Sequence, residues 1–229
     1  MKLNEIHFES IDSTNTFARE NAGTLPVPSL ITAREQTAGR GRHGKSFYSP
    51  KDTGIYFTLL FEPESGFDLI TPAAAVCVCE AVQELTGKTA EIKWVNDIFY
   101  GGAKVAGILC EKINSGGLIA AGIGINLTTS DFPAGIPSAG SLGAVTDGIS
   151  LARRISEKLL AVSENFDRDE IIRGYSRRLF ILGRKVRYEK NGVLREGTAS
   201  GINADCNLIV SLEGGIDILN SGEISLILS

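Results

Sequence analysis

Apolar residues recur at helical spacing in four stretches of the chain. A first helix is expected to begin at Ser13 or Thr14, whose hydroxyl groups can cap a helix start, and to run toward Asn21. A second is expected between Thr71 as its cap and Gly87 beyond its end, and its small apolar residues on most sides predict that it is buried. Two further helices are predicted behind Ser150 and over residues 169–182.

Shorter apolar runs bounded by Gly, Asn, Asp and Ser predict strands on either side of these helices. In the first part of the chain these runs cover residues 5–8, 30–33, 54–61, 91–95, 104–112 and 118–127. The last three are joined by turn-forming residues, which predicts an antiparallel meander. Beyond residue 184 the runs cover residues 186–189, 194–202, 208–212, 216–219 and 224–228. Strands so close together in sequence suggest a small barrel.

The order of the predicted elements favours the α+β class, because helices and strands lie in runs and do not alternate strictly. We expect a first domain over residues 1–182, built on a mixed or antiparallel sheet, and a small β-barrel domain over residues 183–229. A chain of 229 residues can bury roughly 70% of the surface that it exposes when unfolded, so a substantial core is expected.

Composition and charge narrow the kinds of partner. With 43% hydrophobic and 22% charged residues, the chain is typical of a globular protein. A formal net charge of -4 argues against non-specific nucleic-acid binding, which needs a clustered basic surface. The N-terminus lacks a signal-peptide pattern, and no apolar run approaches the roughly 18 residues of a membrane span. We therefore expect a cytoplasmic protein that binds neither nucleic acid nor membranes.

The cysteines and histidines do not predict a metal site. Cys77, Cys79, Cys110 and Cys206 lack the spacing of zinc ligands, and we interpret them as small hydrophobic residues of the core. The two histidines of the chain are too few for a histidine-rich metal site.

A loop rich in glycine and basic residues follows the second predicted strand. Residues 39–46, Gly-Arg-Gly-Arg-His-Gly-Lys-Ser, match the phosphate-binding P-loop pattern letter for letter. That pattern needs a helix to begin at its Lys-Ser, and the proline and glycine that soon follow make such a helix improbable. We interpret the loop as an anion clamp, in which exposed backbone N–H groups alternate with Arg40, Arg42 and Lys45. A P-loop nucleotide hydrolase and a surface loop with incidental charges stay as alternatives.

A second group of polar residues surrounds the predicted meander. Its segments are residues 93–97 (Lys-Trp-Val-Asn-Asp), 104–111 (Lys-Val-Ala-Gly-Ile-Leu-Cys-Glu) and 122–126 (Gly-Ile-Gly-Ile-Asn). Glycines inside strands, as at Gly107 and Gly122, are costly unless something approaches the backbone closely. Each segment alone has an ordinary explanation, as a solvated lysine, a turn or a bulge.

Together, five motifs in chain order resemble the catalytic module of biotin protein ligases. They are a Ser-Thr-Asn helix start, a Gly-Arg-Gly-Arg loop followed by Ser-Pro, a Lys-Trp-Pro-Asn-Asp turn, a Lys before Ala-Gly-Ile-Leu, and Gly-Ile-Gly-Ile-Asn, here spread over residues 13–126. The chain departs from this pattern at Val95, where a proline is usual, and at Phe47, where a tryptophan is common. The resemblance implies a catalytic domain like that of class II aminoacyl-tRNA synthetases. Residues 182–228 resemble, less specifically, the family's SH3-like barrel.

The resemblance also implies substrates and site residues. The substrates are ATP and biotin, with Mg²⁺, and the partner is a biotin carboxyl carrier protein such as that of acetyl-CoA carboxylase. The implied biotin site comprises Ser13, Thr14, Asn15, Gln36, Gly39, Arg40, Gly41, Arg42, Lys104, Gly107, Ile108 and Gly122. The implied ATP site comprises Arg40, Arg42, Lys45, Phe47, Trp94, Asn96, Lys104 and Asn126. Because the catalytic module begins at residue 1, the DNA-binding domain of the family's repressor members is expected to be absent.

The resemblance and the chemistry of the two steps that it implies suggest three catalytic residues. Adenylation brings the biotin carboxylate against the α-phosphate, and two unit charges ~4 Å apart repel by ~4 kcal/mol at an effective dielectric constant near 20. Arg42 and Lys104 are the cations that we expect to offset this repulsion. In the transfer step, a carrier lysine with a pKa near ~10.4 must lose a proton before it attacks. We expect Asp97 to accept or orient that proton.

Two other functions stay open at this point. A lipoate or octanoate protein ligase has a similar fold and similar acyl transfer to lysine, although the Gly-Arg-Gly-Arg loop favours biotin. An inactive module that only binds a carrier protein is the non-enzymatic alternative, and intact Arg42 and Lys104 argue against it. Strand edges beside the site could also pair with the carrier or with a second copy in a homodimer.

Overall fold

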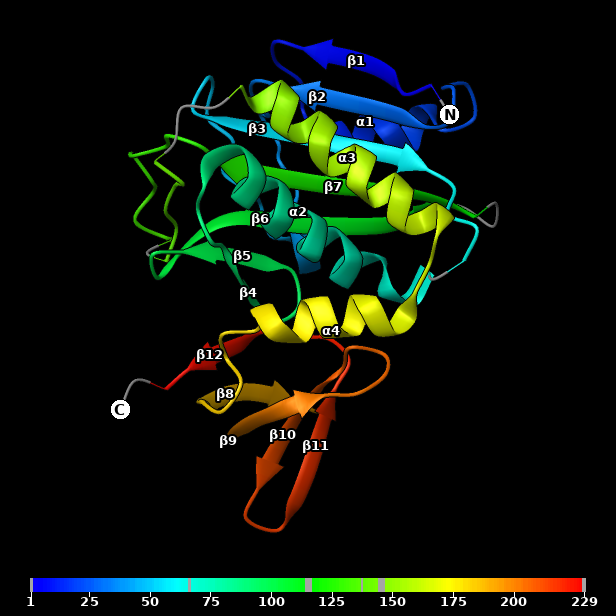
Figure 1. The fold of residues 1–229 in the computed structure, drawn as a ribbon. Coiled ribbons are helices and arrows are strands. Elements are labelled where there is room, and N and C mark those ends of the chain that lie inside the picture. The colour runs from blue at the N-terminus through cyan, green and yellow to red at the C-terminus, as the bar shows by residue number, and fades with distance from the viewer. Residues whose placement is uncertain (1, 66, 114–116, 137, 144–146, 228–229) are drawn as a thin grey trace.

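The core of the protein is a seven-stranded mixed sheet (Figure 1). The computed structural model describes residues 2–65, 67–113, 117–136, 138–143 and 147–227. In spatial order the strands are β1 (Asn4–Phe8), β2 (Ser29–Ala33), β3 (Gly54–Phe61), β7 (Leu118–Asn126), β6 (Ala103–Ile113), β5 (Asp97–Tyr100) and β4 (Glu91–Lys93). The pair β1–β2 is parallel and all other neighbours are antiparallel, so the α+β class and the mixed sheet are confirmed.

The meander contains one strand more than the sequence predicted. We expected residues 96 and 97, with the glycines at 101 and 102, to form the connection between two strands. Instead β5 begins at Asp97 and pairs with β4 on one side and β6 on the other. A strand of four residues between turn-forming segments carries little local signal, and pairing with both neighbours determines it.

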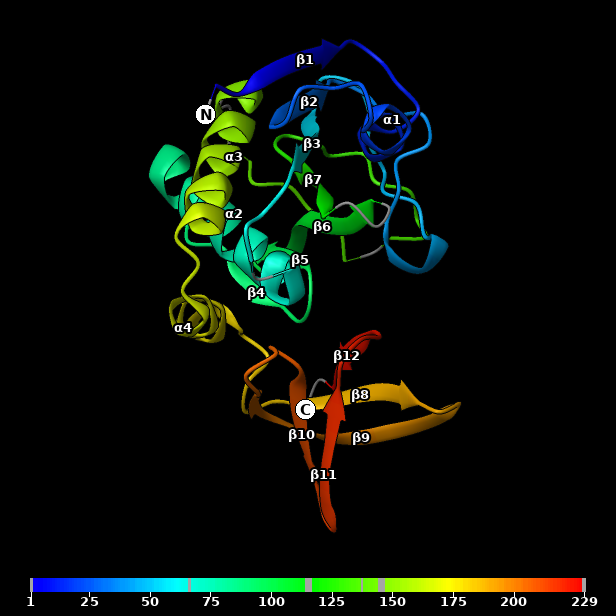
Figure 2. The same ribbon diagram turned by 90° about the vertical axis from the view of Figure 1, so that its right-hand side faces the viewer.

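Helices cover both faces of the sheet (Figure 2). The helices α2 (Ile70–Thr86) and α3 (Gly148–Glu164) pack on one face, and α1 (Thr14–Asn21) packs against β2, β3 and β7 on the other. Helix α4 (Arg168–Arg178) lies beside α2 and leads to the C-terminal strands. No helix among the described residues is long and apolar enough to cross a membrane.

Helix ends follow the predicted chemistry in α1 and differ from it elsewhere. Ser13 caps α1 and accepts a hydrogen bond from the Thr16 N–H. Helix α2 begins at Ile70, and not behind Thr71, because a 3₁₀ turn over Phe67–Leu69 already winds the chain. The predicted stop at Gly87 is confirmed. Gly87 has a left-handed φ of 70°, and its backbone N–H donates to the Gln83 carbonyl oxygen.

The last two helices also begin and end away from the predicted positions. Helix α3 is capped by Asp147, whose carboxylate accepts the N–H groups of Ile149 and Ser150, so Ser150 lies inside the helix. Helix α4 ends at Arg178, four residues before the predicted end at residue 182. The reason is tertiary, because Leu179 leaves the helix to bridge Ile92 of β4.

The small residues of α2 are buried against the sheet, as predicted. Cys77 and Cys79 are among them, and burial raises the pKa of each thiol to about 12. Cys206 is buried as well, whereas Cys110 is half-buried on β6. The described residues contain no group of three His, Cys, Asp or Glu side chains placed to hold a metal ion.

The C-terminal strands form a separate five-stranded antiparallel sheet. In spatial order these strands are β11 (Gly215–Leu219), β10 (Leu208–Leu212), β9 (Val193–Ile202), β8 (Lys185–Lys190) and β12 (Ile224–Leu226). The sheet curls, since the buried Asp217 of β11 accepts hydrogen bonds from Tyr188 and Lys190 of β8, each at 2.7 Å. Hydrogen bonds from Lys190 and Tyr188 lower the pKa of Asp217 to about 2.

Contacts of Trp94 and of Arg168 are among those that attach the C-terminal part to the sheet domain. The indole N–H of buried Trp94 donates to the Cys206 carbonyl oxygen at 2.9 Å. Arg168 at the start of α4 forms ion pairs with Asp68 and Asp205. The segment that follows β4 is therefore in direct contact with the C-terminal domain.

Candidate active site

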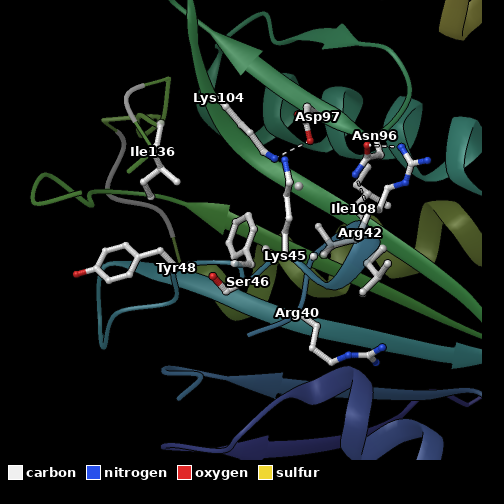
Figure 3. A pocket seen from close by; sticks show the side chains of 18 of the residues that line it. Arg40, Arg42, Lys45, Ser46, Tyr48, Asn96, Asp97, Lys104, Ile108 and Ile136 are labelled. Carbon is white, nitrogen blue, oxygen red and sulfur yellow. Dashed lines mark hydrogen bonds and ion pairs between the residues drawn. The ribbon is translucent and has the colours of Figure 1, made fainter. Parts of the chain in front are cut away.

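A cavity of about 370 Å³ lies on the sheet face that carries α1. Its walls come from distant parts of the chain: the start of α1, the Gly/Arg loop, strands β5 to β7, residues 132–136, and residues 222–225 of the C-terminal domain. Figure 3 shows Lys104 and Lys45 extending from different walls toward the same region of the cavity. Both polar clusters of the sequence thus meet in one place.

All but one of the sequence-predicted site residues line this cavity. They are Ser13, Thr14, Asn15, Gln36, Arg40, Gly41, Arg42, Lys45, Phe47, Trp94, Asn96, Asp97, Lys104, Gly107, Ile108, Gly122 and Asn126. Gly39 is the exception, because it is buried at the base of the loop. A Cβ atom there would lie 2.4 Å from the Phe47 carbonyl oxygen, so Gly39 lets the two sides of the loop approach each other.

The glycines of β6 and β7 make room for side chains of the protein itself. A Cβ atom on Gly124 would lie 2.4 Å from the Phe47 ring, and one on Gly107 would lie 3.0 Å from it. A Cβ atom on Gly122 would lie 2.0 Å from the side-chain oxygen of Asn15. The close approach that the glycines predicted is confirmed, and the groups that approach are Phe47 and Asn15.

One end of the cavity carries a network of neutral hydrogen-bonding groups. The Thr58 hydroxyl donates to Asn15 Oδ1 at 2.5 Å and lies 2.9 Å from Thr14 Oγ1. Gln36 Oε1 accepts the Thr14 N–H at 2.9 Å. These side chains are held in place by one another, which suits recognition of a neutral ligand group with donors and acceptors of its own. Thr58, on the buried strand β3, gave no signal in the sequence.

The Gly/Arg loop is held to the sheet by a bidentate ion pair. Arg40 Nη1 and Nη2 donate to the two carboxylate oxygens of Glu111 at 2.7 and 2.8 Å. Glu111 on β6 also accepts from Asn15 Nδ2 at 3.1 Å. Sequence reasoning missed Glu111, because it lies 71 positions from its arginine. Arg40 therefore anchors the loop in this structure.

The geometry of the loop excludes the P-loop alternative. A single 3₁₀ turn over Arg42–Gly44 contains His43 in a left-handed conformation with φ of 53°. No helix follows in residues 45–53, and the next regular element is strand β3. The helix N-terminus that a P-loop requires is absent from this described stretch.

Three lining cations have different partners. Lys104 Nζ lies 2.6 Å from Asp97 Oδ1 across the β5–β6 pair. Lys45 forms an ion pair with Glu223, which lowers the pKa of that carboxyl group. The Arg42 guanidinium donates to the neutral Asn96 side chain at 3.1 Å, so its charge is not neutralised there. The predicted catalytic trio of Arg42, Asp97 and Lys104 thus lies in one cavity, with two of its members in contact.

Asn126 offers a vacant acceptor. Its Nδ2 donates to the Gly140 carbonyl oxygen at 2.9 Å, while its buried Oδ1 has no partner among the described residues. A buried acceptor without a donor costs about 1–3 kcal/mol. A ligand N–H group in the cavity would remove that cost.

Comparisons with known proteins find relatives that cover most of this chain. The chain is 30% identical over 240 residues to the bifunctional ligase/repressor BirA of Bacillus subtilis, covering 96% of this chain and 73% of that protein. It is 28% identical over 228 residues to the biotin–[acetyl-CoA-carboxylase] ligase of Mycobacterium tuberculosis, covering 93% and 85%. The structure of the biotin protein ligase from Aquifex aeolicus in complex with biotin and ATP superposes with a TM-score of 0.83 at 28% identity, over 99% of both chains.

The matched family model defines the class of protein. The chain belongs to the biotin/lipoate A/B protein ligase family, whose model matches residues 7–128. Within that family it carries the biotin protein ligase C-terminal domain, which matches residues 181–227. The cavity described above is formed by residues of both matched regions.

Proposed function

We propose that this protein is an ATP-dependent biotin protein ligase. It forms biotinyl-adenylate and pyrophosphate from biotin and ATP, and then transfers biotin to a lysine of a biotin carboxyl carrier protein. The observation that carries the proposal is the cavity in which uncompensated Arg42 and the Lys104–Asp97 pair lie beside a network of neutral hydrogen-bonding groups. The family match and the C-terminal domain support the biotin branch.

In the adenylation step, a biotin carboxylate oxygen attacks the α-phosphorus of ATP, and pyrophosphate leaves with the electrons of the broken bond. Arg42 and Lys104 stabilise the charge that two anions bring together, because each can place N–H donors between them. A carboxylate is ionised at neutral pH, so this step needs no general base. Mg²⁺ bound with ATP would supply further positive charge at the phosphates, since the lining carboxylates Asp97 and Glu223 already hold lysines.

The other lining residues have roles in recognition. The network of Thr14, Asn15 and Gln36 binds the neutral ring end of biotin, with Ser13, Gly107, Ile108 and Gly122 forming the wall around it. Asn126 Oδ1 accepts from the adenine amino group, which supplies the missing donor. Phe47, Trp94 and Asn96 border the nucleotide, and Lys45 lies near its phosphates.

In the transfer step, the lysine of the carrier loses a proton and attacks the carbonyl carbon of the adenylate, and AMP leaves. Asp97 accepts or orients that proton, and its contact with Lys104 keeps the carboxylate at the reacting end of the cavity. The Arg40–Glu111 pair keeps the loop over the adenylate in the interval between the steps.

The remaining assignments follow from the same function. We place the catalytic domain at residues 1–182, with a fold like that of class II aminoacyl-tRNA synthetases, and an SH3-like barrel at residues 183–229, whose curled sheet supports that description. The carrier subunit of acetyl-CoA carboxylase, or a similar one, is the proposed partner. We place the reaction in the cytoplasm, where ATP is abundant, and leave homodimer formation through exposed strand edges to be measured.

Transfer to a carrier tests the proposal. The protein is incubated with Mg²⁺, ATP and unmodified biotin carboxyl carrier protein, together with either biotin or lipoate, and the modified carrier is measured by its mass. We expect a mass increase of one biotin on the wild-type carrier, and none on a carrier whose acceptor lysine is replaced by arginine. Modification by lipoate alone would select the lipoate ligase alternative, and an unmodified carrier would favour an inactive binding module.

A further inference from the structure

Lys93 is a cavity lysine to which the mechanism above gives no role. It is the last residue of β4, and the register pairs it with Asp97 of β5, so both side chains leave the sheet on the same face. Its side chain lines the cavity, and its Nζ lies 5.8 Å from the centre of the Phe99 ring. Lys93 therefore faces the same space as the reacting groups.

The cavity has more positive charge than its carboxylates neutralise. Arg40 is paired with Glu111, Lys45 with Glu223, and Lys104 with Asp97. Within the part of the chain that the structure describes, neither Lys93 nor Arg42 forms an ion pair with a carboxylate. Lys93 and Arg42 are thus two cations that a negatively charged ligand could neutralise.

The surroundings of Lys93 make its isolation costly. Burial is the main cause that lowers the pKa of Lys93. The nearby charges act in both directions, because Asp97 and Glu223 raise this pKa while Lys104 and Lys45 lower it. A half-buried ammonium group without a counter-ion is unfavourable, and an anion in the cavity would relieve it.

We propose that Lys93 binds the β- and γ-phosphates of ATP and the pyrophosphate that they become. This inference rests on the proposed ligase function. During adenylation the bond between the α-phosphorus and the bridging oxygen breaks, and the oxygen leaves with the electron pair as part of pyrophosphate. Arg42 and Lys104 serve the biotin carboxylate and the α-phosphate, and the charge of Lys45 near the phosphates is shared with Glu223. The extra charge of the leaving group is therefore met by Lys93, whose charge no carboxylate neutralises. A singly charged adenylate alone would not need this additional cation.

Pyrophosphate dependence of the exchange reaction tests the assignment. Biotin-dependent ATP/pyrophosphate exchange is measured in magnesium buffer at varied pyrophosphate for the wild type, Lys93→Met and Lys93→Arg. Loss of the charge in Lys93→Met should raise the KM for pyrophosphate about tenfold or more, while Lys93→Arg, which keeps the charge, should stay within about threefold. Lys88→Met is the matched control, since Lys88 lies outside the cavity wall and contacts Tyr100.

A second readout separates phosphate binding from proton transfer. Single-turnover transfer from preformed biotinyl-adenylate to the carrier should change less than about twofold in both Lys93 variants, because pyrophosphate has already left at that stage. An unchanged KM for pyrophosphate in Lys93→Met would overturn the proposal. Slow transfer in both variants with an unchanged KM would overturn it in favour of Lys93 as the proton acceptor.

The wild-type protein gives a test that does not depend on a folded variant. Pyrophosphate with Mg²⁺ should protect Lys93 from acetylation by acetic anhydride, mapped by mass spectrometry, and should leave Lys88 equally reactive. Equal labelling of Lys93 with and without pyrophosphate would reject the assignment. Absence of any biotin-dependent exchange in the wild type would instead reject the ligase function, so the two failures are distinguishable.

Discussion

At the scale of single residues, the cavity depends on positions that lack a side chain. The Phe47 ring lies against Gly124 and Gly107, and it also makes an edge contact with Tyr56 at 6.3 Å between ring centres. A ring enclosed in this way has little room to move except into the cavity. Its position therefore fixes part of the proposed nucleotide site.

Gly124→Ala should push the Phe47 ring toward the cavity, since the new Cβ atom would lie 2.4 Å from it. We expect kcat/KM for ATP to fall roughly tenfold, because displacing a group that positions the substrate by about 1 Å is enough for such a loss. Steady-state kinetics at saturating biotin measures this. Gly23→Ala is the control, since nothing lies within 4 Å of a Cβ atom there. Equal kinetics of the two variants would show that the ring has no such role.

At this scale the sequence predicted most of the residues that line the cavity, but not the side chains that they contact. Glycines in β6 and β7 predicted a close approach, yet Phe47 and Asn15 could not be named as the approaching groups, because strand pairing over long sequence distances brings them there. Glu111 and Lys93 were missed for the same reason. A role for their charges can be inferred only once the fold places Glu111 beside Arg40 and Lys93 beside Asp97.

At the scale of elements, the Gly/Arg loop is the part of the site that a few contacts hold in place. It joins β2 to β3 and contains a single 3₁₀ turn, and its side chains hold it over the cavity through Arg40–Glu111, Arg42–Asn96 and Lys45–Glu223. A loop held by a few side-chain contacts, of which the bidentate pair is the strongest, can open for substrates and close over an intermediate. Loss of the Arg40–Glu111 pair should therefore allow the adenylate intermediate to escape into solution.

Glu111→Gln should release biotinyl-adenylate into solution faster than the wild type, because the neutral amide cannot form the charged bidentate contact with Arg40. Release is measured by trapping free adenylate in the absence of carrier, and Arg42→Gly should act in the same direction. Glu196→Gln breaks a similar pair with Arg187 on the exposed C-terminal sheet and serves as the control. If Glu111→Gln retained its adenylate as well as this control, the loop would be held by other means.

The elements that sequence reasoning predicted well are those with strong local signals. Ser13 as a cap and Gly87 as a stop were correct, because these residues act on the backbone within one turn. The predicted end of α4 was wrong, and strand β5 lies where a connection was predicted, because Leu179 and Asp97 pair with strands elsewhere in the chain. The curl of the C-terminal sheet likewise depends on Asp217 and its distant donors.

At the scale of the whole molecule, the C-terminal domain completes the cavity. Residues 222–225 line it, and Glu223 holds Lys45 of the Gly/Arg loop. Trp94 links the segment after β4 to Cys206 of the same domain. The five C-terminal strands were predicted from sequence, but their contribution to the site was not, because nothing local to residues 222–225 indicates what they face.

The most direct test of the account is ATP/pyrophosphate exchange by the purified protein with biotin, with lipoate and with neither, alongside Lys104→Ala and the control Lys88→Ala. The account predicts exchange only with biotin, retained in Lys88→Ala and reduced to background in Lys104→Ala, because adenylation of a carboxylate is the reversible step that this cavity is built to perform. Exchange with lipoate in place of biotin, or no exchange with either acid, would contradict it.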